Sequence, residues 1–108
     1  TKDLAYCLLC TEHVLDEQEQ HAYLEKYLSF LEPLLIVRGD PSPTLADLSG
    51  AYQLSVCDFA RWMSGWGWSG HERMMEQRCA GALYAIDHGC NLGSEQAYRE
   101  AVFKAFPV

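Results

Sequence analysis

The chain has 108 residues, of which 49% are hydrophobic and 21% are charged, so it is a folded domain and not a disordered or fibrous chain. The net charge of −7 argues against nucleic-acid binding, because that function requires a basic face. We expect no membrane partner either, because no apolar run is long enough to cross a bilayer.

The cysteines indicate the cellular location that we expect, and the first residues bear on whether the chain is part of a longer one. Five cysteines are an odd number and show no disulfide-framework spacing, so we expect reduced thiols and a cytoplasmic protein. The chain begins at Thr1 and enters an apolar segment at once. We therefore expect residues 1–108 to form a single helical domain that is a piece of a longer chain.

Two helices are expected before the first proline-rich loop. Asp3 is a candidate N-cap for a first helix that runs through Val14 and is apolar nearly all round, hence buried. Residues 16–19 mark a break with a new cap. A second helix follows, and Pro33 is expected to end or kink it. Its apolar residues repeat at intervals of three and four: Tyr23, Leu24, Tyr27, Leu28 and Leu31.

A third helix is expected after the loop at residues 38–43, which holds two prolines and a glycine. Thr44 and Asp47 form a capping-box pattern at its start, and Gly65 and Gly67 mark its end. Its apolar stripe consists of Leu48, Tyr52, Val56, Phe59 and Met63.

Two further helices complete the predicted fold. Ser69 and Glu72 repeat the capping box at the start of the fourth helix, which ends at Gly89 and Gly93. Ser94 caps a fifth helix, which Pro107 stops. The expected inward-facing residues are Met75, Cys79, Ala82, Leu83 and Ile86, then Tyr98, Val102 and Phe106. No alternating β pattern is present, so the sequence predicts an all-α fold of about five helices joined by short loops.

The tryptophans provide the candidate binding site. All three lie within residues 62–68, where Gly65 and Gly67 interrupt the segment and allow a ligand to approach the backbone. Indole rings hold cations over their faces, and a nearby carboxylate adds negative charge for an amine. The alternative is that Tyr52 and one or two indoles pack inward on the third helix. The candidate substrate-binding residues are Tyr52, Asp58, Trp62, Trp66, Trp68 and Glu72.

Other patterns in the sequence give weaker indications of a metal site or a catalytic site. Cys7, Cys10 and His13 are spaced by three residues and could bind zinc, but a structural zinc site needs a fourth ligand, which favours structural cysteines. There is no nucleophile elbow, phosphate-binding glycine loop or spaced carboxylate pair. We therefore assign no catalytic residue and no metal ligand.

Three segments of the sequence match a known pattern: Asp-Leu-Ala-Tyr at 3–6, Tyr-Leu-Glu-Lys-Tyr at 23–27 and Cys-Asp-Phe-Ala-Arg-Trp-Met at 57–63. Through these segments the chain resembles the C-terminal helical part of the aminoglycoside phosphotransferase and choline kinase-like superfamily. The His-Gly-Asp catalytic loop and the metal-binding aspartate motif of that superfamily are absent, since His88-Gly89 is followed by Cys90. The resemblance thus implies a C-terminal fragment, with ATP and Mg²⁺ held by the missing part and no cofactor in this chain.

The resemblance implies a substrate-side helical subdomain of an ATP-dependent small-molecule phosphotransferase that is not catalytic alone. The expected partners are a small cationic or hydroxyl-bearing substrate, or the missing catalytic half. Two alternatives remain open. One is a self-contained helical interaction module that uses the Trp-Gly segment, and the other is a small-ligand or metal binder that uses Cys7, Cys10 and His13.

Overall fold

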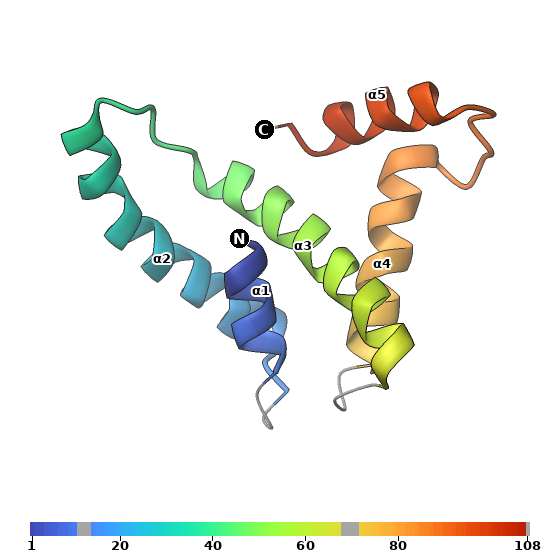
Figure 1. Cartoon of the computed structure of the whole chain (residues 1–108), viewed down its shortest axis with the longest axis horizontal. Helices are drawn as coiled ribbons and strands as arrows, with labels where there is room; N and C mark the ends of the chain where they lie inside the picture. Colours follow the sequence, from blue (N-terminus) through green and yellow to red (C-terminus); the bar gives the residue numbers. More distant parts are fainter. Residues whose placement is uncertain (11–13, 68–71, 108) are drawn as a thin grey trace.

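The computed structural model describes residues 1–10, 14–67 and 72–107 (Figure 1). Within these ranges the chain forms only α-helices, which confirms the predicted all-α fold. The helices are α1 (Lys2–Leu9), α2 (Glu17–Arg38), α3 (Leu45–Trp66), α4 (Glu72–Asp87) and α5 (Glu95–Ala105). None of the helices in the described ranges has the length and apolar character needed to cross a membrane.

Side-chain caps fix the starts of three helices. Asp16 and Glu19 form a reciprocal capping box at α2, since the backbone N–H of each donates to the carboxylate of the other. The box predicted for α3 is confirmed: Asp47 N–H donates to Thr44 Oγ1 over 3.1 Å, and Thr44 N–H donates to the Asp47 carboxylate over 2.9 Å. Ser94 caps α5 as predicted. Ser69, the predicted cap of α4, lies outside the described residues.

The prediction for the first helix is wrong at both ends. Thr1 is the N-cap residue of α1, and Asp3 lies within its first turn. The helix ends at Leu9, and Val14 is exposed and not helical. Helices α1 and α2 run in roughly opposite directions (Figure 1), and a first helix running through Val14 would leave only two residues before α2 for that change of direction.

Of the two effects expected at Pro33, an end or a kink of the second helix, the end is not met, because α2 continues through Pro33 to Arg38. A proline ring removes one backbone N–H donor but leaves the rest of the helix able to bond. Gly39 ends the helix instead, in the left-handed conformation at φ 75°, and its N–H bonds back to the last turn.

Helix α3 is the centre of the fold, with α1 and α2 on one side and α4 on the other (Figure 1). Its predicted stripe faces the interior, although Met63 at the end of the stripe is only half-buried. The buried core draws on four helices and on Leu15, two residues before α2: Ala5, Leu8, Leu9, Leu15, Leu24, Tyr52, Val56, Phe59, Ala60 and Met75.

Helices α4 and α5 are less buried than predicted. Met75 and Ala82 are buried, and Cys79 and Ile86 are half-buried on the same face, but Leu83 is exposed. The α4 residues that pack against α3 follow the spacing 75, 79, 82 and 86, and Leu83 lies beside this face and not on it. In α5 the residues predicted to face inward are half-buried, and none of the helix is fully buried.

Helix α2 carries two apolar stripes. Leu24 is buried, and Leu28, Leu31 and Leu35 are half-buried along the same side. A second stripe with the same spacing of three and four is exposed to solvent. We call this the α2 outer stripe; it consists of Tyr23, Tyr27, Phe30, Leu34 and Val37. The predicted repeat of residues 23–31 therefore divides between two sides of the helix.

Candidate functional site

Trp62 and Trp66 lie one turn apart at the C-terminal end of α3, so their rings share one side of the helix. The rings are stacked, with centroids 5.6 Å apart and an interplanar angle of 20°. The exposed fractions of Trp62 and Trp66 are 51% and 76%. Two of the three predicted indoles thus form an accessible aromatic surface, and Trp68 lies outside the described residues.

A groove of about 280 Å³ opens beside this surface, between α1 and α3. Asp58 and Trp62, two of the predicted substrate-binding residues, both line it. The complete lining consists of Lys2, Asp3, Tyr6, Ser55, Asp58, Phe59, Arg61 and Trp62. We call this the α1–α3 groove.

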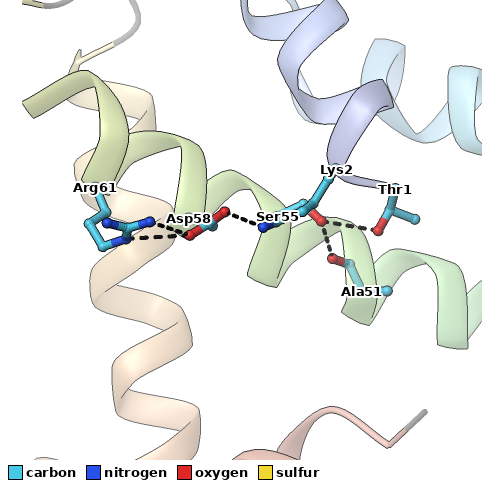
Figure 2. Close-up of polar contacts among 6 residues, drawn as sticks. All are labelled: Thr1, Lys2, Ala51, Ser55, Asp58 and Arg61. Atoms are coloured by element: carbon cyan, nitrogen blue, oxygen red, sulfur yellow. Dashed lines mark hydrogen bonds and ion pairs between the residues drawn. The ribbon is translucent and has the colours of Figure 1, made fainter. Parts of the chain in front are cut away.

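The carboxylate of Asp58 is paired with two cations (Figure 2). Lys2 Nζ lies 2.9 Å from Oδ2, and Arg61 donates from Nη2 and Nε to Oδ1 over 3.0 and 3.3 Å. The hydrogen bonds from Lys2 and then from Arg61 lower the pKa of Asp58. Because two exposed cations already offset its charge, Asp58 provides little attraction for a further cation.

Contacts between α1 and α3 hold the groove together. Ser55 Oγ donates to Ala51 O over 2.8 Å, so Thr1 Oγ1 is the donor in the 3.0 Å bond to Ser55 Oγ (Figure 2). The rings of Tyr6 and Phe59 meet edge to face, with centroids 5.2 Å apart. These contacts bring Lys2 and Tyr6 of α1 to the side of α3 that carries Asp58 and Trp62.

Tyr52 does not join the indoles. Only 2% of it is exposed, and its hydroxyl donates to Gln20 Oε1 over 2.8 Å, while Gln20 Nε2 donates to Leu15 O over 2.8 Å. Burial raises the pKa of Tyr52, and the nearby Arg78 charge opposes part of that rise. Ten positions of α3 separate Tyr52 from Trp62, which is about 15 Å along the helix axis. Tyr52 therefore packs inward, as the alternative interpretation of the sequence predicted.

Glu72, the last predicted site residue, is the first residue of α4 and is half-buried. It is not among the residues that line the α1–α3 groove. Of the predicted set, Asp58 and Trp62 line one groove, Trp66 stacks on Trp62, and Tyr52 lies in the core.

Several residues of the groove were not predicted from the sequence. The pairing of Arg61 with Asp58 could have been found, since a spacing of three places opposite charges together on a helix. Lys2, Tyr6 and Ser55 had no such signal, because only the packing of α1 on α3 places them in the groove.

The cysteines of the described residues are free thiols. Cys7 and Cys10 are exposed, and His13, the third residue of the zinc hypothesis, lies outside the described ranges. Cys57 of α3 neighbours Cys79 of α4; burial, and then this second thiol, raise the pKa of Cys57 to about 12. Residues 1–10, 14–67 and 72–107 contain no group of three or more His, Cys, Asp or Glu side chains that could hold a metal ion.

Comparison with known proteins identifies no relative of this chain: no family model, no curated protein and no solved structure matches it.

Proposed function

We propose that the chain is the substrate-side helical subdomain of an ATP-dependent small-molecule phosphotransferase. The α1–α3 groove is the observation that supports this role most directly. It combines an accessible indole with a carboxylate and two cationic side chains in a volume of about 280 Å³, which suits part of a small polar molecule. The phosphotransferase assignment itself rests on the resemblance of residues 3–6, 23–27 and 57–63 to that superfamily.

Of the two expected substrate types, the groove favours a hydroxyl-bearing molecule over a purely cationic one. A carboxylate can accept about four hydrogen bonds. Asp58 accepts two from Arg61 on Oδ1 and one from Lys2 on Oδ2, which leaves capacity for a substrate hydroxyl. The indole of Trp62 covers the apolar side of such a molecule, and Lys2 and Arg61 donate to its oxygens.

The parts that handle ATP and Mg²⁺ are proposed to lie in a further protein segment. Among the described residues no group of three or more His, Cys, Asp or Glu side chains comes together that could hold a metal ion. We therefore assign no step of phosphoryl transfer to this chain. The exposed α2 outer stripe supports its proposed role as a part of something larger, because a helix face of this kind is typical of an interface.

The first test is the intact mass of the natural gene product in its source cells. A mass several times the 12.2 kDa of these 108 residues, with a His-Gly-Asp motif in the additional sequence, is the expected result. A natural product of 12.2 kDa would contradict the proposal.

The second test uses that full product in an ATP-dependent phosphorylation assay with a panel of sugars, polyols and amino alcohols. Trp62→Ala and Asp58→Asn are expected to raise KM for the preferred substrate by about tenfold, with a smaller change in kcat, because they alter substrate binding. Tyr84→Ala, which removes an exposed ring from α4, is the control. Unchanged KM in both groove variants would contradict the role of the groove.

The second candidate function is a self-contained helical interaction module. The stacked, exposed pair of Trp62 and Trp66 favours it, since aromatic residues are enriched at the centres of protein interfaces. A 12.2 kDa natural product that elutes from its source extract in a larger complex would support this function. The complex should then be lost in the double variant Trp62→Ala/Trp66→Ala and kept in Tyr84→Ala.

A further inference from the structure

Arg78 of α4 is a half-buried cation that its own chain holds only weakly. The guanidinium carbon lies 5.7 Å from the centroid of the Tyr52 ring, and Nη1 is 3.4 Å from Gln53 Oε1. Its Nε is covered by protein and has no hydrogen-bond partner. The closest polar contact of this residue is made by its backbone, whose carbonyl accepts from Gln53 Nε2 over 2.8 Å.

No carboxylate of the described residues lies within 4 Å of the Arg78 guanidinium to form an ion pair. Charges that are removed from water are normally paired, whereas exposed charges need no partner. The half-buried Arg78, without an ion pair among the described residues, is therefore an exception. An arginine cannot escape the cost of burial by losing its proton. Three of the four exposed arginines do have such partners, in the pairs Arg38–Asp40, Arg61–Asp58 and Arg99–Glu95, and the exposed Arg73 has none among the described residues.

Space for a partner exists on two sides of Arg78. It lines a cavity of about 240 Å³ bounded by α2, α3 and α4, together with Ser49 and Gln53. It also lines a second cavity of about 500 Å³, again with Gln53. Arg78 therefore borders both cavities, and Ser49 and Gln53 line the first of them with a hydroxyl and an amide group.

We propose that Arg78 anchors a binding site for an oxyanion, the carboxylate or phosphate group of a small molecule. The planar guanidinium matches both groups, because two parallel N–H donors can meet two oxygens of either. Ser49 and Gln53 supply further hydrogen-bonding groups in the same cavity. This site is separate from the α1–α3 groove, and the proposal does not rest on the proposed function.

Glu17 is the competing partner within the chain. It lines both cavities, and its side chain is exposed at the start of α2. An oxyanion that binds Arg78 enters against the charge of this carboxylate. Glu17→Gln should therefore tighten oxyanion binding severalfold. If Glu17 instead pairs with Arg78 in solution, Glu17→Gln would lower Tm as much as Arg78→Gln does and add no affinity, which would overturn the proposal.

The direct test compares sodium phosphate and sodium acetate with sodium chloride at equal ionic strength, by calorimetric titration and by Tm. Phosphate or acetate should bind and raise Tm beyond the chloride effect, and the two salts separate the two ligand groups. Arg78→Gln should weaken this binding by about tenfold or more. Arg73→Gln, which removes an exposed arginine of the same helix, should leave it unchanged.

A measurement on the wild-type chain covers the case in which Arg78→Gln does not fold. The Nε–H resonances of the arginines are followed by NMR while phosphate and acetate are added. A saturable shift of the Arg78 resonance alone is expected. Equal small shifts of all arginines, or no shift with either salt, would overturn the proposal.

Discussion

Tyr52 contributes to stability through its hydroxyl as well as its ring, because it donates to the buried Gln20. Tyr52→Phe leaves Gln20 Oε1 without this donor inside the core. We expect the free energy of unfolding to fall by about 1–3 kcal/mol, the cost of an unsatisfied buried polar group. Urea denaturation measures this loss. Tyr84→Phe, at an exposed position, should change stability by less than about 0.5 kcal/mol, and equal effects would contradict the assignment.

Cys57 is expected to be the slowly reacting thiol of its helix pair. Because burial and the Cys79 thiol raise its pKa to about 12, little thiolate is present at pH 8. Iodoacetamide at pH 8 should label the exposed Cys7, Cys10 and Cys90 well before Cys57, as followed by peptide mass spectrometry. In urea the difference should disappear. Equal labelling of the folded chain would contradict the pKa shift.

The same shift of the Cys57 pKa contributes to a loss of stability at alkaline pH. The folded-state pKa of Cys57 lies above the ordinary value of 9.0, so the folded state holds the proton more tightly than the unfolded state does. The contribution of Cys57 is therefore complete below about pH 9 and is lost as pH rises toward 12. Cys57→Ser should flatten this part of the Tm–pH profile.

At the scale of one element, Pro33 weakens the second half of α2. It cannot donate to the carbonyl of Ser29, and an interior proline costs a helix about 3 kcal/mol. Pro33→Ala should stabilise the chain by about 1–2 kcal/mol, less than that cost because proline also restricts the unfolded chain. Slower amide hydrogen exchange in residues 34–38 checks this. Glu32→Ala is the matched control. If Pro33→Ala slows exchange no more than Glu32→Ala does, the prediction is contradicted.

The helix starts show which helix boundaries can be predicted from nearby residues alone. The capping boxes at Asp16 and Thr44 and the cap at Ser94 form within a few residues, so their patterns predict them. The end of α1 differs, because it depends on the change of direction between α1 and α2 (Figure 1). Leu83 fits a helical repeat in the sequence, but the line along which α4 meets α3 leaves it exposed.

At the scale of the molecule, the helices form an open array. The radius of gyration is 15.1 Å, against about 13 Å for a compact domain of this length. Helices α2 and α5 extend away from the shared core, and no element of the described part of the chain covers the α2 outer stripe (Figure 1). Val37, at the end of this stripe, is 87% exposed.

The exposed stripe predicts that the isolated chain associates as its concentration rises, because apolar side chains spaced by three and four residues suit packing against another helix. Light scattering should show a mass above 12.2 kDa at high concentration. Phe30→Lys/Val37→Lys should restore the monomer. Ala80→Lys/Gln96→Lys, which adds the same charge at exposed positions elsewhere, should not. A monomer at all concentrations would contradict this prediction.

The sequence by itself determined the helical class, most helix starts and the central stripe of α3, because periodicity and caps act over one or two turns. Its candidate set included Asp58, Trp62 and Trp66, which lie within nine residues of one helix. Only the tertiary structure decided that Tyr52 is buried on Gln20, that Lys2 joins Asp58, and that Arg78 lacks a carboxylate. These relations depend on how separate helices pack, and residues distant along the chain carry no local sign of such contacts.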